Sequence, residues 1–482
     1  MNKKRIALTL FSALISEITN KIVPLITLHF VASKLGTSAF GVSQFAMWLL
    51  DWGIFATVYG FTQVGPIMLS KAKTTEDQRN VHGSVVFSRL LLAVISTFIL
   101  FLAVQEPSNY APYKWAVLSS ITILFTSAID ASWILMARQK MTFWSLLSIF
   151  AKLGSLIAIL QFIQSPDDAV KFVVITSLAN SFISVSSFLI ALRLIGISMP
   201  SHQQIRSALK LSTPFAVSTL FMMLLDRYDW FIVERYLGPS DTGIYSAAAK
   251  LVASITPITV TITTIFYSEM MAHQDRDSIE RHLKASIFWA VSALAPVVVG
   301  VWFVDGDILA LIFGPQFATG ARTLSLLISA SAFYGVITIF GFQLLTLKGL
   351  WKPLVYALGL GAAAGVSLSL SFINQFGMMA VASSAIVGKF VCAVIVAHVA
   401  MKIWRLNGTS LLLQTIKAAV PAAIMGVSLY GFLLGKLIPA QLAPILSVAA
   451  VIYGCAFTAL NFREMIDIYL KVRGRILGRY SA

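Results

Sequence analysis

Apolar stretches of about twenty residues recur along almost the whole chain, and short polar links join them. A bilayer core about 30 Å thick is crossed by roughly 20 helical residues. Because no link is long enough for a separate water-exposed domain, the pattern predicts an all-α membrane protein with about 14 transmembrane helices. These helices are expected at residues 6–32, 40–69, 83–105, 115–137, 143–163, 172–194, 209–235, 242–270, 284–304, 318–346, 353–372, 377–401, 410–434 and 442–462.

Composition agrees with this prediction, since 58% of the residues are hydrophobic and 12% are charged. The formal net charge of +16 would fit a nucleic-acid partner, but its distribution argues otherwise. With the helices placed as above, 24 of the 36 basic residues lie on the side of the N-terminus and six lie in the opposite loops. Since basic residues gather on the cytoplasmic side of membrane proteins, both termini are expected to be cytoplasmic.

The sequence lacks the clusters typical of an enzyme. No group of His, Cys and carboxylate residues has the spacing of a metal site, and no nucleotide-binding fingerprint occurs. Cys392 and Cys455 stand alone in apolar stretches, so no disulfide framework is expected. Glu17 and Lys21 in the first apolar stretch indicate a first helix, not a cleaved signal peptide. We therefore expect a protein that is not an enzyme and that uses no cofactor or metal.

An internal repeat is visible in the turns after two of the expected helices. Leu35–Gly41 and Leu237–Gly243 both read L-G-x-S-x-x-G, at an offset of 202 residues. Six helices per repeat give both halves the same orientation, so the fold is expected to contain two parallel six-helix repeats plus two accessory helices. The expected domains are an N-terminal lobe over 1–208, a C-terminal lobe over 209–405, accessory helices over 406–462 and a basic cytoplasmic tail over 463–482. The tail is expected to be an amphipathic helix or a stop-transfer flank.

Charged residues inside the expected helices bear most directly on function. A charge near the bilayer centre costs about 2.5–3.5 kcal/mol on insertion scales, so these side chains have to face a cavity, each other or a ligand. The lysines expected deepest in the membrane are Lys152, Lys250 and Lys389. They predict either a water-filled cavity for an anionic substrate or cross-helix salt bridges to Asp51 or Asp130. Arg89 could also reach the interface, and Glu17 with Lys21 has the spacing of a local ion pair. The candidate substrate-binding cations are Lys21, Arg89, Lys152, Arg227, Lys250 and Lys389.

Polar positions also fall on single helix faces, at helical steps of three and four residues. Such a stripe is either a helix–helix contact or the wall of a lumen, and several charged stripes within the first eight expected helices favour a lumen. Asp51 and Asp130 each lie in one of these stripes. A carboxylate there can load and release a proton or Na⁺, which makes Asp51, Asp130 and, secondarily, Glu17 candidates for ion coupling.

Three short segments resemble signatures of polysaccharide transporters in the multidrug/oligosaccharidyl-lipid/polysaccharide exporter superfamily. They are D-W-F-I-V-E-R-Y-L-G over 229–238, G-I-Y-S-A-A-A-K-L over 243–251 and I-F-G-P-Q-F over 312–317. The chain looks like a Wzx-type flippase for O-antigen or exopolysaccharide units, as used in lipopolysaccharide biosynthesis. The resemblance implies a multi-pass protein of the bacterial inner membrane that works by alternating access. Its implied substrate is an oligosaccharide linked to undecaprenyl pyrophosphate.

The same resemblance implies the partners of the chain. They are the lipid-linked oligosaccharide, membrane lipid, H⁺ or Na⁺, and polysaccharide polymerase and chain-length proteins, with no nucleic acid. A cation-coupled multidrug antiporter of the same superfamily is the alternative, although a surplus of buried cations would repel cationic drugs. A membrane-bound polysaccharide polymerase or ligase fits less well, because the outside links are short.

Overall fold

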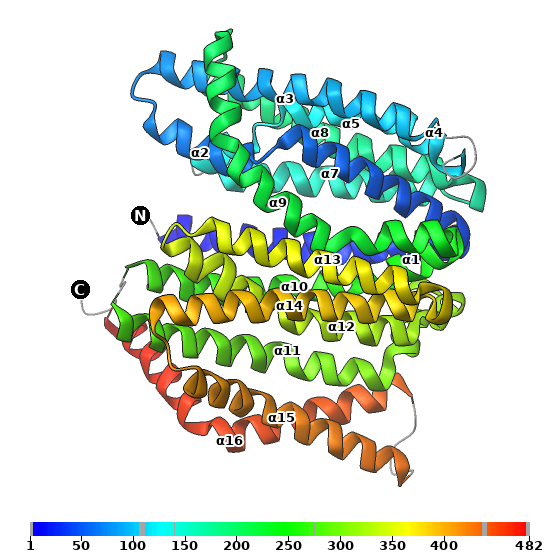
Figure 1. The fold of residues 1–482 in the computed structure, drawn as a ribbon, viewed down its shortest axis with the longest axis vertical. Helices are drawn as coiled ribbons and strands as arrows, with labels where there is room; N and C mark the ends of the chain where they lie inside the picture. The colour runs from blue at the N-terminus through cyan, green and yellow to red at the C-terminus, as the bar shows by residue number, and fades with distance from the viewer. Residues whose placement is uncertain (1–2, 106–110, 139, 273–274, 436–440, 479–482) are drawn as a thin grey trace. The chain divides into compact units, whose positions relative to one another are not determined.

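The computed structural model describes residues 3–105, 111–138, 140–272, 275–435 and 441–478, and the side chains within these ranges except those of 3–22, 111–112, 141–143, 258, 268 and 462–478. All the elements of this part are helical (Figure 1). The principal helices are α1 (Lys3–Val58), α2 (Phe61–Lys71), α3 (Thr75–Ala103), α4 (Ala111–Ser120), α5 (Thr122–Ile129), α6 (Ser132–Ala137), α7 (Met141–Phe162), α8 (Ala169–Ile195), α9 (His202–Leu237), α10 (Pro239–Ala272), α11 (Arg276–Phe313), α12 (Ala321–Val336), α13 (Trp351–Phe376), α14 (Met378–Trp404), α15 (Gly408–Leu434) and α16 (Leu442–Gly478).

Within the described residues, 13 segments are long and apolar enough to cross a membrane. The first of them, Val23–Lys71, has 49 residues and would be about 70 Å long as one straight helix, more than twice the thickness of a bilayer core. Gly36 interrupts it with non-helical torsion angles (φ 70°, ψ 179°), so this segment makes two crossings. The prediction of an all-α membrane protein with about fourteen transmembrane helices is confirmed.

The two turns of the internal repeat adopt the same backbone conformation. Gly238 has φ 86° and ψ −174°, close to the values of Gly36, and both lie in the left-handed region that favours glycine. The Thr37 hydroxyl lies 2.9 Å from that of Ser240. These shared turns support the prediction of two parallel repeats.

The backbones of the two turns also touch in a reciprocal way. A Cβ atom on Gly41 would lie 1.8 Å from the carbonyl oxygen of Pro239, and a Cβ on Gly243 would lie 2.0 Å from that of Thr37. Contacts in which each copy of a motif touches the matching position of the other are the mark of a two-fold relation. Only glycine permits this approach, which explains why the motif ends in Gly in both copies.

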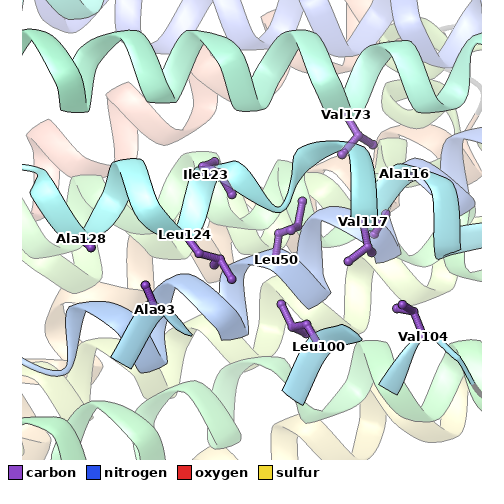
Figure 2. Close-up of a cluster of buried hydrophobic side chains, with 11 residues drawn as sticks. Leu50, Ala93, Leu100, Val104, Ala116, Val117, Ile123, Leu124, Ala128 and Val173 are labelled. Carbon is purple, nitrogen blue, oxygen red and sulfur yellow. The ribbon is translucent and has the colours of Figure 1, made fainter. Parts of the chain in front are cut away.

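The helices form two compact units. The first lies within residues 1–247, 310–317 and 365–384. In it, α1 packs against α3, α4, α5, α7 and α8. The contact among α1, α3, α4, α5 and α8 is filled by alanine, valine, leucine and isoleucine side chains, among them Leu50, Ala93 and Leu124 (Figure 2). Small residues let membrane helices approach closely, and dispersion contacts then stabilise the packing.

The second unit lies within residues 248–309, 318–364 and 385–482. Here α15 and α16 pack against each other, and both contribute buried side chains to a cluster with Val304 of α11. Helix α16 is interrupted at Asn461 and continues as helix to Gly478, so the described part of the tail is helical. Its amphipathic role at the inner leaflet stays a prediction, as do the domain boundaries at 208 and 405.

Several of the expected helices are not continuous α-helices, and three of them are interrupted well inside their length. The one over 40–69 breaks at Tyr59 and Gly60, which both have positive φ. The one over 115–137 is divided into α4, α5 and α6, and its second break leaves Asp130 and Ala131 outside helical geometry. In the second repeat, the helix over 318–346 turns π-helical over Ile337–Leu345. Such interruptions free backbone groups and often occur at functional positions.

Candidate functional site

An ion pair joins α1 to α9 inside the first unit. Arg227 Nη1 lies 2.7 Å from Asp51 Oδ2. The side chains of Arg227 and Asp51 are 42% and 47% exposed. Two charges within membrane-spanning segments would be strongly unfavourable in contact with hydrocarbon, and pairing removes their net charge while leaving polar surface accessible. The sequence singles out both residues, but it assigns them to substrate binding and ion coupling and does not foresee that they pair.

Aromatic rings lie on the same two helices as this ion pair. The Trp48 indole N–H donates to the carbonyl oxygen of Arg227 at 3.1 Å. The Trp48 ring stacks on Phe45, with a centroid distance of 5.1 Å, and on Phe231, at 6.3 Å. Trp52 meets Trp48 edge-on at 5.8 Å. The Trp48 hydrogen bond therefore holds the α9 backbone that carries Arg227 against α1.

A second charged cluster lies at the break between α5 and α6. Arg89 of α3 is 1% exposed, and its Nη1 donates to the backbone carbonyl of Asp130 at 2.9 Å. The Asp130 carboxylate accepts from the hydroxyls of Ser132 and Ser187. The Arg89 guanidinium also lies over the Phe61 ring. Arg89 thus satisfies a carbonyl that the helix break leaves without its helical partner, and it is buried instead of extending to the interface.

Two carboxylates on α9 that the sequence does not select for function accept hydrogen bonds from tyrosine hydroxyls. Tyr113 donates to Glu234, and Tyr245 donates to Asp229. Asp229 also accepts from the backbone N–H of Trp230. Their signal in the sequence is weak, because a tyrosine in an apolar stretch is common. These pairs link α9 to α4 and to the start of α10, next to the repeat turn.

The three deeper lysines are half-buried. Lys152 lies on α7 in the first unit, whereas Lys250 on α10 and Lys389 on α14 lie in the second. Lys389 Nζ is 5.9 Å from the centroid of the Tyr334 ring, and none of the three lysines is without an interaction partner. Glu17 and Lys21 belong to the part of α1 whose side chains lie outside the described residues. The roles of all these residues stay predictions.

Repeated helices, paired turns and charges satisfied inside the helices define a polytopic helical transporter fold. Comparison with solved structures shows the same fold. A lipid II flippase MurJ in an inward closed conformation matches with a TM-score of 0.78, at 16% identity, over 95% of this chain and 100% of that one. An inward-facing multidrug resistance MATE family transporter matches with a TM-score of 0.65, at 14% identity, over 80% of this chain and 94% of that one.

The chain belongs to the polysaccharide biosynthesis protein family, whose model matches residues 9–267. A putative O-antigen transporter of Escherichia coli (strain K12) is 24% identical over 52% of this chain. The succinoglycan biosynthesis transport protein ExoT of Rhizobium meliloti (strain 1021) is 25% identical over 63% of it. Each alignment spans 61% of the relative's own length. The resemblance to polysaccharide transporters is thereby confirmed.

Proposed function

We propose that this protein is a flippase that moves undecaprenyl-pyrophosphate-linked oligosaccharides from the cytoplasmic to the periplasmic leaflet. The observation that carries the proposal is membership of the polysaccharide biosynthesis protein family, with two curated relatives described as an O-antigen transporter and a succinoglycan transport protein. The fold shared with a lipid II flippase supports a lipid-linked substrate. Transport without catalysis and a location in the inner membrane follow from this function. The excess of basic residues on one side of the expected helices supports cytoplasmic termini.

The substrate combines an anionic head with a neutral, hydroxyl-rich saccharide. A pyrophosphate crossing a low-dielectric region needs cations along its path, and Lys152, Lys250, Lys389, Arg227, Lys21 and Arg89 are the candidates. Arg89 would have to leave the Asp130 carbonyl in order to contact a ligand. Lys152, Lys250 and Lys389 are half-buried, and we assign the pyrophosphate contact to them.

Alternating access is the proposed mechanism of movement. An ion gradient would drive it through an intramembrane carboxylate, with Asp51, Asp130 or Glu17 as the carrier. Protonation of Asp51 would leave Arg227 without its counter-charge, and in this proposal that change is coupled to movement of α9 relative to α1. Asp130 is held by two serine hydroxyls and is the less mobile candidate.

Ligand-induced thermal stabilisation tests the substrate class. A ligand that binds the folded state at 100 times its Kd stabilises it by about 2.7 kcal/mol. We expect undecaprenyl-pyrophosphate-linked oligosaccharide to raise the melting temperature of the purified protein, and an uncharged polyprenol of equal length to leave it unchanged. A shift with cationic dyes, and none with the lipid-linked oligosaccharide, would favour the multidrug antiporter that the MATE-like fold also allows.

A further inference from the structure

One face of α1 and one face of α9 carry aromatic rings and charges in register. On α1, Asp51 and Trp52 follow Trp48 by three and four residues, so all three lie on one side of the helix. On α9, Arg227 and Phe231 are spaced i, i+4 and also share a side. The Asp51–Arg227 ion pair and the stacking of Trp48 on Phe231 bring the two faces together. We call these five residues the aromatic ion-pair surface.

This surface differs from the outer, lipid-facing side of the helices. Between Gly41 and Gly60, every residue of α1 is buried or half-buried. By contrast, α3 has large apolar side chains with most of their surface open, such as Phe98 at 61%. Protein therefore surrounds the α1 segment. Phe231 is nevertheless 41% exposed, and nearly half of each charged side chain of the pair is accessible.

Hydrogen-bonding capacity is left over on the same surface. The Trp52 indole nitrogen is buried and has no hydrogen-bond partner among the described residues, so a ligand could reach it only after a side-chain movement. The pair is joined by a single contact, Arg227 Nη1 to Asp51 Oδ2, while a guanidinium carries five N–H donors and a carboxylate accepts up to four hydrogen bonds. The ion pair thus keeps accessible donors and acceptors on the same helix faces as the aromatic rings.

The charge balance selects the chemistry of the ligand. A pyrophosphate would seek a cation that lacks a counter-charge, and an organic cation would seek a carboxylate that lacks one. Asp51 and Arg227 neutralise each other, so the surface favours neither ion. A pyranose ring is neutral, presents a C–H face that packs on aromatic rings, and carries hydroxyls that both donate and accept.

We propose that the aromatic ion-pair surface is the subsite for the saccharide part of the substrate, separate from the cations that hold the pyrophosphate. This inference rests on the proposed function and deepens it. Phe231 and Trp52 supply the apolar contact, and the Asp51–Arg227 pair bonds the hydroxyls. One ion pair and two aromatic side chains would recognise hydroxyls and a pyranose face without reading a particular sugar sequence. Such recognition suits substrates that differ in their sugars but share pyranose rings.

The test separates sugar binding from lipid binding. Purified wild-type protein in nanodiscs is titrated with the neutral soluble oligosaccharides cellotetraose and N-acetylated chitotriose, and separately with undecaprenyl pyrophosphate that carries no sugar. Saturation-transfer NMR reports sugar affinity, and thermal shift reports lipid affinity. The variants are Phe231→Leu, Trp52→Leu and the conservative Trp52→Phe. Trp115→Leu on α4 is the matched control, since Trp115 is 69% exposed and lies outside the surface.

We expect the wild type to bind at least one of the oligosaccharides, and Phe231→Leu and Trp52→Leu to weaken that binding about tenfold. Trp52→Phe should recover part of the loss, and undecaprenyl pyrophosphate should bind all variants as it binds the wild type. The subsite is refuted by a wild type that binds neither oligosaccharide, by variants that keep wild-type sugar affinity, or by variants that lose sugar and lipid equally. If the wild type does not bind undecaprenyl pyrophosphate, that result counts against the proposed function. The sugar titrations then test the subsite separately.

Discussion

The Asp51–Arg227 pair poses a definite energetic question, because its two charges are half-exposed within membrane-spanning helices. Exposed pairs contribute about 0–1 kcal/mol, whereas removal of one partner of a buried pair costs about 3–5 kcal/mol. We place this pair near the lower range, at about 1 kcal/mol, because solvent screens it. Asp51→Asn and Arg227→Gln should each lower the melting temperature, and the double variant should lower it by less than the sum. Strictly additive shifts would show that the two charges do not interact.

Arg89 belongs to the upper range, since it is buried and bonded to the Asp130 carbonyl. Arg89→Leu leaves that carbonyl without its donor, and we expect a loss of about 3 kcal/mol or more in stability. Arg89→Lys keeps the charge but has only a compact ammonium to reach the carbonyl, so it should lose less. Fluorescence-detected gel filtration after a heat challenge measures both. If Arg89→Leu withstands the heat challenge as well as the wild type does, the structural role of this residue is contradicted.

The third prediction for single residues concerns the positive charges of Lys152, Lys250 and Lys389. If they contact the lipid pyrophosphate, Lys→Ala should abolish flipping, while Lys→Arg should keep part of it, because charge counts most for phosphate and geometry second. The rate is measured in proteoliposomes with protein amount matched by gel filtration. Wild-type rates in all three alanine variants would remove these lysines from the substrate path.

The repeat turns make a prediction about how α1 and α10 are held together. Gly41→Ala would place a methyl group 1.8 Å from the Pro239 carbonyl oxygen, and Gly243→Ala would meet that of Thr37 at 2.0 Å. Backbone cannot move aside as a side-chain end can, so each variant should lose about 2 kcal/mol or more of stability. Gly154→Ala on α7 is the matched control, because nothing lies within 4 Å of its Cβ position. Equal melting temperatures for Gly41→Ala and Gly154→Ala would contradict the packed turn.

The helices and turns of this fold could be predicted from the sequence, but the breaks within the helices could not. Spans were predictable because bilayer thickness imposes their length, and the turns were predictable because left-handed glycines recur at one offset. The breaks at Tyr59 and at Asp130 were not, since an interrupted and a continuous apolar helix have the same composition. Their causes lie in tertiary contacts, such as Arg89 on the Asp130 carbonyl.

The candidate site was predictable in its residues but not in its pairings. Charges inside apolar stretches are rare enough to single out Asp51, Arg227, Arg89 and Asp130. That Asp51 meets Arg227, 176 positions away, depends on the packing of α9 on α1, which no local pattern contains. Trp48 and Phe231 lie in segments that the sequence singles out, but their contact with each other depends on the same packing.

For the whole molecule, the fold and the family together support one central claim, that the chain carries lipid-linked oligosaccharide across a bilayer. The most direct measurement reconstitutes the purified protein into vesicles whose two leaflets both contain undecaprenyl-pyrophosphate-linked oligosaccharide with a fluorescent label on the sugar. A membrane-impermeant quencher is then added outside. We expect the outer-leaflet signal to vanish at once and the inner-leaflet signal to follow as labelled lipid is flipped outward. Vesicles whose inner-leaflet signal persists as it does without protein, both with and without an imposed pH or Na⁺ gradient and despite folded and inserted protein, would contradict the claim.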